Sequence, residues 1–462
     1  MRKHGLRVLR KMRRMNTPIC DFVRTYAESG SLRLHMPGHK GVPLLGFESY
    51  DITEISGADS LYEADGIIAE SEKNASKLFG CPTFYSTEGS SQCIRAMLHL
   101  ICTNVKKNSR KPVIAAGRNA HKTFISACAL IDFDVIWLTS PGTSYLSCAL
   151  DRDAAERLFD DPETAPDAVY LTSPDYLGNC ADIASVAEVC HRHGALLAVD
   201  NAHGAYLGFL SPSRHPIALG ADICCDSAHK TLPALTGGAY LHIAEKHGDM
   251  ISHAKSALSL YGSTSPSYLI LQSLDAANAY IADGYREKLA DFSAEADLLR
   301  EGLCDLGYTL IPAELLNPEP LKITISAKEY GYTGYALAGY LEEKGLIPEF
   351  ADPDFLVLML TPENKGQCAK ILDVFAGIEK KVPIPHHPPQ FVLPEKAMPV
   401  REAVFSKSEV LPVSRCIGRI LAAVSVGCPP AVPIVVSGER IDEKSVECFR
   451  YYGIAECPVV AE

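Results

Sequence analysis

The sequence lacks three features that would each indicate a particular class of protein. It has no run approaching the roughly 20 apolar residues that span a membrane, because His, Asp or Gly breaks the longest apolar segments. It has no C-x-x-C pair, and its 16 cysteines are scattered, several of them in apolar runs. They are expected to be reduced core residues. The chain is therefore expected to be cytoplasmic, with no membrane partner and no disulfide framework.

Positive charge is scarce outside the first 14 residues. The chain has 44 Lys and Arg against 56 Asp and Glu, a formal net charge of −12, and seven of the basic residues lie in residues 1–14. We expect no basic face that would bind the phosphate backbone of a nucleic acid, so nucleic acid is not an expected partner. The basic segment is typical of an import presequence or of a disordered tail before a start at Met15. The missing apolar stretch favours the tail.

What is present is typical of a large folded protein. Hydrophobic residues make up 47% of the chain, a fraction typical of soluble folded proteins. Its length of 462 residues suggests about three structural units. Short apolar runs alternate with helical patterns, which indicates an α/β fold with a mainly parallel sheet wrapped by helices. The expected strands are 112–116, 135–138, 168–172, 195–200, 222–225 and 239–243, and the expected helices include 70–79, 121–130 and 183–193.

Six prolines between positions 383 and 399 mark a linker, because proline continues neither a helix nor an interior strand. The predicted organisation is an N-terminal arm (1–50), a large α/β domain (51–275), a smaller α+β domain (276–382), the linker (383–399) and a C-terminal α+β domain (400–462).

The ends of two expected strands carry an acid and a lysine. Asp200 closes one apolar run, and the next run leads through Asp226-Ser-Ala-His to Lys230. Ligands of open α/β sheets collect outside the carboxyl ends of the strands. A pyridoxal phosphate enzyme needs this pair, a lysine for the aldehyde and a carboxylate for the pyridine nitrogen. The spacing therefore predicts a pyridoxal 5'-phosphate site and gives no metal-ligand set.

A phosphate cradle is expected at Gly89, Ser90 and Ser91, small residues that precede a helical pattern. Ser227, three residues before Lys230, supplies another hydroxyl, and His121, at the start of a helix, is the candidate for stacking on the cofactor ring.

Each residue also has an ordinary structural interpretation. Asp200 alone is more typical of a helix N-cap, and the serines could only cap their helix. His203 could be a core histidine. Lys40 and Lys122 also follow histidines, but neither follows a buried strand as Lys230 does.

These motifs resemble those of the orn/lys/arg decarboxylase family, in its short members without an N-terminal wing, which have the aspartate aminotransferase fold (pyridoxal phosphate fold type I). The similarity runs from about Asn16 to Glu439. Its carriers are Leu34-His-Met-Pro-Gly-His-Lys-Gly41, Asp51-Ile-Thr-Glu-Ile55, Glu88-Gly-Ser-Ser91, Gly117-Arg-Asn-Ala-His-Lys122, Asp200 with Ala202-His-Gly204, Asp226-Ser-Ala-His-Lys230, Ser265-Pro-Ser-Tyr268, Cys428-Pro-Pro and Ser437-Gly-Glu439.

The resemblance implies roles for individual residues. Lys230 would be the Schiff-base lysine, Asp200 the partner of the pyridine nitrogen and His121 the stacking residue. Thr264 and Ser265 would reach the phosphate of a neighbouring subunit, so a homodimer or a higher homo-oligomer would share its active sites. The remaining implied ligands are Ser90, Ser91 and Ser227 for phosphate and Glu439 for the distal cation of the substrate.

The sequence departs from the family pattern at several positions. Glu88 stands where Asn is usual, Asn201 where Glu is usual, Tyr206 replaces a histidine, and Asp175 replaces Thr. Ala423 and Ala431 replace Glu and Gly. These departures concern substrate choice more than the reaction.

The resulting hypothesis is decarboxylation of a basic amino acid, arginine or lysine before ornithine, in polyamine-type metabolism. Lys230, His229 and His203 all remain candidates for protonating the substrate's alpha carbon. The alternatives are an aminotransferase or beta-eliminating lyase of the same fold, and a silent cofactor-binding regulator, which the extra charges of Glu88 and Asp175 would favour.

Overall fold

The computed structural model describes residues 15–105, 110–139, 144–311, 318–385, 387–424 and 432–462. Their largest element is a seven-stranded sheet in the order β1-β7-β6-β5-β4-β2-β3. Pairing is parallel from β6 through β5, β4 and β2 to β3, and antiparallel at β6–β7 and β1–β7. The strands are β1 (Thr83–Ser86), β2 (Val113–Gly117), β3 (Asp134–Leu138), β4 (Ala168–Thr172), β5 (Leu196–Asp200), β6 (Ile223–Asp226) and β7 (Ala239–Ile243).

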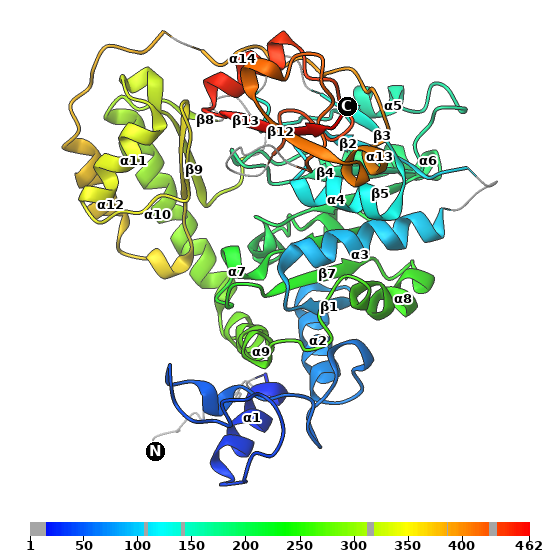
Figure 1. Ribbon diagram of the computed structural model, residues 1–462. Coiled ribbons are helices and arrows are strands. Elements are labelled where there is room, and N and C mark those ends of the chain that lie inside the picture. The colour runs from blue at the N-terminus through cyan, green and yellow to red at the C-terminus, as the bar shows by residue number, and fades with distance from the viewer. Residues whose placement is uncertain (1–14, 106–109, 140–143, 312–317, 386, 425–431) are drawn as a thin grey trace, which may run out of the picture.

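The sheet is buried on both faces because alternate strand residues point to opposite sides. Ala198 packs in a core with α3, α4 and α8, whereas its neighbours Leu197 and Val199 pack in a second core with α5 and α6. Figure 1 shows these helices around the sheet. The helices of this region are α2 (Ile67–Phe79), α3 (Gly89–Asn104), α4 (Lys122–Ile131), α5 (Arg152–Arg157), α6 (Ile183–Arg192), α7 (Ala228–Thr231), α8 (Gly248–Ser259) and α9 (Tyr268–Ala282).

The six expected strands of this sheet are all present, each within about one residue of its expected bounds. The sequence analysis missed β1. That strand has four residues, only two of them apolar, and its place is set by pairing with β7, from Thr83 opposite His242 to Ser86 opposite Ala239. Such pairing depends on register between distant segments, so local periodicity does not reveal it.

A second, antiparallel sheet has the order β10-β11-β9-β8. It packs with the long helix α10, and these elements form the yellow-green part of Figure 1. The elements are α10 (Tyr285–Asp305), β8 (Leu310–Ile311), β9 (Lys322–Ser326), α11 (Gly334–Glu343), β10 (Phe350–Ala351), β11 (Phe355–Met359) and α12 (Cys368–Ala376).

The C-terminal part has its own small core around the buried Phe449, and it lies in Figure 1 at the opposite end of the molecule from the N-terminal arm. Its elements are α13 (Val400–Phe405), β12 (Ser408–Pro412), α14 (Glu443–Tyr451) and β13 (Glu456–Val460), with β12 and β13 paired antiparallel.

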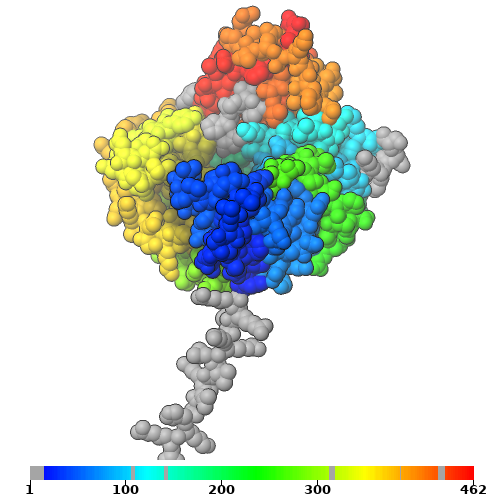
Figure 2. All heavy atoms as spheres, turned by 60° about the horizontal axis from the view of Figure 1, so that its bottom comes forward, coloured from blue at the N-terminus to red at the C-terminus, as the bar shows by residue number. Residues whose placement is uncertain are grey.

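The N-terminal arm starts with α1 (Pro18–Glu28). Asp275 of α9 accepts hydrogen bonds of 3.0 Å from the backbone N–H groups of Ile19 and Cys20, which ties the first turn of α1 to the large domain. The stretch that follows, residues 32–50, carries exposed apolar side chains and lies at the molecular surface, in the blue region of Figure 2.

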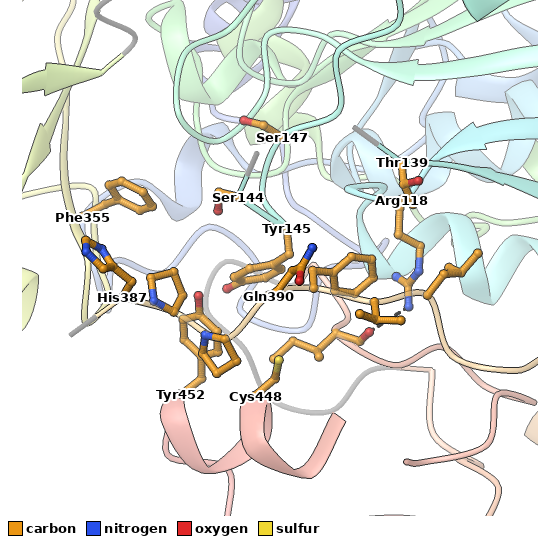
Figure 3. A pocket seen from close by; sticks show the side chains of 16 residues that line it. Arg118, Thr139, Ser144, Tyr145, Ser147, Phe355, His387, Gln390, Cys448 and Tyr452 are labelled. Atoms are coloured by element: carbon orange, nitrogen blue, oxygen red, sulfur yellow. Dashed lines mark hydrogen bonds between the residues drawn. The ribbon is translucent and has the colours of Figure 1, made fainter. Parts of the chain in front are cut away.

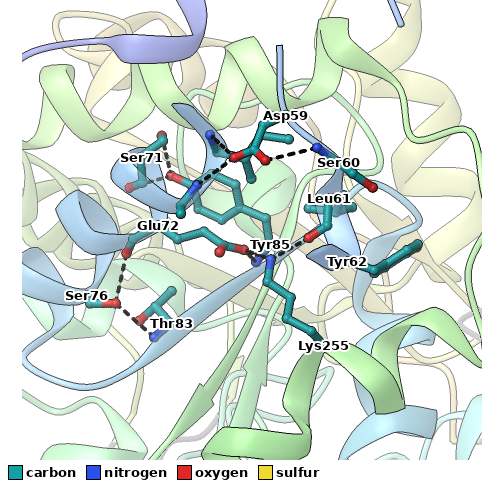
Figure 4. A network of polar contacts seen from close by, with 12 residues as sticks. Asp59, Ser60, Leu61, Tyr62, Ser71, Glu72, Ser76, Thr83, Tyr85 and Lys255 are labelled. Atoms are coloured by element: carbon teal, nitrogen blue, oxygen red, sulfur yellow. Dashed lines mark hydrogen bonds and ion pairs between the residues drawn. The ribbon is translucent and has the colours of Figure 1, made fainter. Parts of the chain in front are cut away.

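A buried polar network joins α2 to α8 beneath the arm (Figure 4). Glu72 pairs with Lys255 and accepts a 2.8 Å hydrogen bond from the backbone N–H of Tyr85. Asp59 caps the start of α2, accepting from the N–H groups of Gly66 and Ile68. In the described residues, no helix has the length and apolar character required to cross a membrane.

Candidate active site

The carboxyl ends of β5 and β6 bring the two central residues together. Asp200 is the last residue of β5, and Lys230 lies on the short helix α7, four residues after the end of the parallel neighbour β6. The negative charge of Asp200 acts on Lys230, and the charge of Lys230 acts on Asp200, so the two groups share one environment. The pairing of β5 with β6 therefore brings Asp200 and Lys230 to the same edge of the sheet, and their roles toward a cofactor stay a prediction.

Asp200 is a buried carboxylate whose hydrogen-bond donors among the described residues are all neutral. It accepts from the Tyr170 hydroxyl at 3.2 Å, the Ala202 N–H at 3.2 Å and the Cys225 thiol at 3.7 Å. Burial raises its pKa, an effect that the charge of Lys230 opposes. A buried carboxylate without a hydrogen-bonded cation is suited to a cationic ring nitrogen.

Lys230 lies beside His203, with 3.0 Å between Nζ and Nε2. The other ring nitrogen, Nδ1, is 3.4 Å from Nζ of Lys322, which also donates to the Asp175 carbonyl at 2.9 Å. Burial lowers the pKa of Lys230, and the charges of Asp200 and Glu349 oppose that effect. Burial, followed by the charge of Lys230, lowers the pKa of His203 well below its usual value, so its imidazole is neutral near pH 7.

The cradle residues meet at the N-terminus of α3. The Ser227 hydroxyl donates to the Ser90 hydroxyl at 2.9 Å, joining the N-cap of α7 to the first turn of α3. Gly89 opens α3 with a φ of +71°, a left-handed conformation that glycine adopts without a Cβ penalty. Ser91 pairs with the hydroxyl of Thr123 at 3.2 Å. Hydroxyls and N–H groups at a helix N-terminus provide an anion-binding environment.

His121 is the N-cap of α4. Its Nδ1 accepts a 3.1 Å hydrogen bond from the Thr123 N–H, which fixes the ring. Burial, with the charge of Lys230 next, lowers the pKa of His121 to about 4. His229 is held by its own contact, 3.0 Å between Nδ1 and the Gly238 carbonyl, and burial lowers its pKa. A neutral, fixed imidazole at position 121 has the form that stacking requires.

The residues present fit pyridoxal 5'-phosphate. The buried Asp200 carboxylate, the Ser90–Ser227 hydroxyl pair and the Lys230 amine are the three kinds of group that its ring nitrogen, phosphate and aldehyde require.

Thr264 and Ser265 are exposed, in the loop between α8 and α9. The described contacts do not join them to the serine pair of the same chain. The neighbouring Ser263 N–H donates to the Glu88 carboxylate, which anchors this loop beside the cradle.

Glu439 is placed differently from the residues around Lys230. It is buried and paired with Arg118, with 3.0 Å between Oε2 and Nη2, and it accepts from the Val436 N–H. Arg118 also donates to the carbonyls of Pro433 and Ile434 at 2.7 and 2.9 Å. The charge of Glu439 is therefore already matched within the chain.

A cavity of about 560 Å³ lies beside this pair, between the large domain, the linker and α14. Figure 3 shows Tyr145, Tyr452 and Arg118 around it. Ser147 also lines it, and the Ser147 hydroxyl donates to Asp175 at 2.6 Å. The cavity is thus connected to the loop after β4 through this hydrogen bond, while its described lining contains neither Lys230 nor His203.

The positions that depart from the family pattern have partners of their own. Asp175 accepts from Ser147, from the Leu177 N–H and from both the side chain and the N–H of Asn179. The Asn201 amide donates to Asp226 at 2.6 Å, and the Tyr206 hydroxyl donates to Glu319.

Ala423 accepts from the Ser437 hydroxyl through its carbonyl. Ala431 lies outside the described residues, as do residues 1–14 and the Cys428-Pro-Pro motif.

The sequence analysis missed several residues of this region. Lys322, Glu349 and Tyr176 come from other segments, and the ring centroid of Tyr176 lies 5.2 Å from that of His203. The one signal in the sequence that could have indicated Lys322 was its position as a lysine at the start of the apolar strand β9.

Solved structures identify the fold class. A lysine decarboxylase of Francisella novicida, LdcF, superposes with a TM-score of 0.76 at 17% identity over 96% of this chain and 81% of that one. Lysine decarboxylase A of Pseudomonas aeruginosa has a TM-score of 0.76 at 18% identity, over 95% and 76% of the two chains. The chain has the type I fold of pyridoxal phosphate enzymes, as expected.

Family models place the chain more narrowly. Residues 17–306 match the model described as Orn/Lys/Arg decarboxylase, major domain, and residues 384–457 match its C-terminal domain. The chain belongs to the Orn/Lys/Arg decarboxylase family. An arginine decarboxylase of Bacillus subtilis is 28% identical over 94% of this chain and 93% of its own length. The uncharacterised protein YaaO of the same organism is 31% identical over the same shares.

Proposed function

We propose that the protein decarboxylates a basic amino acid with pyridoxal 5'-phosphate, arginine or lysine before ornithine. The observation that carries this proposal is the convergence of Asp200, Lys230 and the Ser90–Ser227 pair at one edge of the sheet. The full-length similarity to arginine decarboxylases supports the choice of substrate class.

Bound to Lys230, the cofactor supplies an electron sink for the pair of electrons left when carbon dioxide departs. The chain's own residues place and hold it. Asp200 would keep the ring nitrogen protonated, His121 would stack on the ring, and Ser90 with Ser227 would bind the phosphate. Holding the reacting bond in one orientation is the protein's main contribution to rate.

The alpha carbon must then receive a proton. Lys230, His203 and His229 remain the candidates, and Lys230 and His203 are 3.0 Å apart. Burial lowers the pKa of both side chains, so each is a stronger acid than usual when it carries the extra proton.

The distal cation of the substrate needs a free carboxylate, and we infer that Glu349 supplies it, because no side-chain partner of Glu349 is found among the described residues. Phe350, its neighbour on β10, packs in the apolar cluster that contains Tyr176. Tyr176 contacts His203, which lies beside Lys230. The charge of Glu349 also acts on Lys230. The other nearby acids, Asp175 and Glu319 among them, are engaged as acceptors within the chain.

A homodimer with shared active sites is part of the proposal. The arm presents Leu34, Leu44 and Leu45 with 84%, 79% and 77% of their surface exposed. Such a contiguous apolar stretch is typical of a protein interface. In a dimer, the exposed Thr264 and Ser265 are available to the site of the partner subunit.

The engaged carboxylates argue against a silent regulator. Glu88 and Asp175, whose charges motivated that alternative, each accept hydrogen bonds within the chain, Glu88 from the Ser263 N–H and Asp175 from the Ser147 hydroxyl.

The test is to incubate the purified protein and pyridoxal 5'-phosphate with each amino acid and to identify the amine released. We expect carbon dioxide and an amine from arginine or lysine. Formation of a keto acid instead would support the aminotransferase alternative. Glu349→Gln should raise KM for the basic substrate about tenfold or more, because it removes a charge-assisted contact. Glu343→Gln on α11 is the matched control.

A further inference from the structure

Four side chains of residue types that bind metals lie close together behind the turn that carries Ser227 and Lys230. Cys224 and Asp226 are two residues apart on β6, so they share one face of the strand. His242 of β7 lies directly opposite Cys224 in the antiparallel register. His215, just before the turn at 216–219, completes the group.

The ligand atoms of His215, Cys224 and Asp226 all lie within 4.8 Å of one another, and His242 joins them through its contact with Asp226. Asp226 Oδ2 is 3.2 Å from His215 Nε2 and 3.1 Å from His242 Nε2, and Cys224 Sγ is 3.9 Å from His215 Nε2. In a tetrahedral zinc site, bonds of about 2.0 Å to N or O and 2.3 Å to S place the ligand atoms roughly 3.3–3.6 Å apart. A small displacement of each side chain therefore admits one ion.

Burial provides a second argument. All four side chains are essentially inaccessible to solvent. A carboxylate, a thiol and two imidazoles therefore face one another away from water, and buried ionisable groups of this kind are paired or coordinate a metal.

A divalent ion would be electrically balanced by one carboxylate, one thiolate and two imidazoles. The Cys224 thiol would have to release its proton for the ion to bind.

The surroundings also match those of a metal centre. Asp226 Oδ1 accepts a 2.6 Å hydrogen bond from the Asn201 amide, and His242 Nδ1 lies 2.9 Å from the Thr83 hydroxyl. The Phe79 ring packs against both imidazoles, with centroids 5.4 and 4.6 Å away. Ligands oriented by outer hydrogen bonds within an apolar shell are typical of bound metals.

We propose that His215, Cys224, Asp226 and His242 hold one divalent transition-metal ion of the zinc class in a closed structural site. Four protein ligands leave no position open for substrate, so the ion fixes the ends of β6 and β7 rather than entering the reaction. The proposal is independent of the substrate, and metal content tests it without turnover.

The experiment uses the full-length protein with its cofactor, produced with added Zn²⁺ and dialysed against metal-free buffer. Elemental analysis should find about one zinc ion per chain. Cys224→Ser and Asp226→Asn should each lose it. Cys190→Ser, which alters an equally buried cysteine outside the group, should retain it. Replacement with Co²⁺ should produce thiolate-to-metal absorption in the wild type and in Cys190→Ser.

A folded wild-type protein that retains no zinc after this exposure would overturn the proposal and leave hydrogen bonds as the whole explanation of the group. Zinc retained equally by Cys224→Ser and by the wild type would also overturn it. If Cys224→Ser fails to fold, the Co²⁺ spectrum of the wild type decides, because absence of the thiolate band excludes Cys224 as a ligand.

Discussion

The amine of Lys230 and the Nε2 atom of His203 lie 3.0 Å apart, while Lys322 approaches the other ring nitrogen at 3.4 Å. A neutral imidazole has one donor and one acceptor nitrogen. With Lys322 donating to Nδ1, the Nε2–H of His203 points to the lone pair of Lys230. This arrangement favours the uncharged amine, which is the nucleophilic form of a lysine.

Replacement of Lys230 tests the central assignment. Lys230→Ala should lose the visible absorbance of covalently attached pyridoxal 5'-phosphate and nearly all decarboxylation, because no other described amine lies beside both Asp200 and the serine pair. Lys122→Ala, the adjacent-histidine control from α4, should retain both. An unchanged absorbance band in Lys230→Ala would remove the assignment.

The stability of the protein should fall as pH drops from about 6.5 to about 4. Over that interval the unfolded chain binds a proton at position 121 that the folded chain excludes, because burial lowers the pKa of His121 to about 4. His121→Asn should reduce the fall in Tm between pH 7 and pH 5, measured by calorimetry. His253→Asn, at an exposed histidine of α8, should follow the wild type. Equal slopes in all three proteins would contradict the prediction.

The Glu72–Lys255 pair should contribute strongly to stability. Lys255→Met leaves the Glu72 carboxylate buried beside Tyr85, which should cost about 3 kcal/mol and lower Tm by several degrees. Adding Glu72→Gln should recover part of the loss. Lys365→Met, which breaks the exposed pair with Asp291, should change the unfolding free energy by less than about 0.5 kcal/mol. Similar losses from the buried and exposed pairs would refute the argument.

The apolar arm should control subunit association. A double change, Leu44→Glu with Leu45→Glu, should shift the protein towards the monomer in analytical ultracentrifugation, because charge would then face an apolar interface. Leu298→Glu on α10, an exposed leucine outside the arm, is the control and should not alter the sedimentation coefficient. A doubly changed arm that leaves the dimer intact would place the interface elsewhere.

The sequence contained enough to predict the large sheet, since Ala168–Thr172 and Ala239–Ile243 are apolar runs bounded by turns. The sequence also predicted that Asp200 and Lys230 lie at one edge of the sheet. Each lies at or just after the end of an apolar strand, and the carboxyl ends of parallel strands meet at the same edge. The side chains that contact these two residues could not be predicted from the sequence in the same way. His203 meets Lys322 through packing of a strand 119 residues away, and no local pattern encodes that meeting.

The same reasoning explains Glu439. Its motif resembled that of a substrate carboxylate, but only the folded chain shows Arg118 beside it. The substrate role of Glu439 therefore stays a prediction, with a guanidinium to displace before any ligand could pair with it.

The Arg118–Glu439 contact has a consequence for engineering of this chain. Arg118 lies three residues before His121. Its guanidinium donates hydrogen bonds to the carbonyls of Pro433 and Ile434 and forms an ion pair with Glu439. A shortened version ending at the proline-rich linker would leave that guanidinium without these acceptors, at the start of the loop that leads to His121, the residue proposed to stack on the coenzyme. Trimming the last 60 or so residues would thus disturb the coenzyme pocket, although no truncated residue need touch the coenzyme itself.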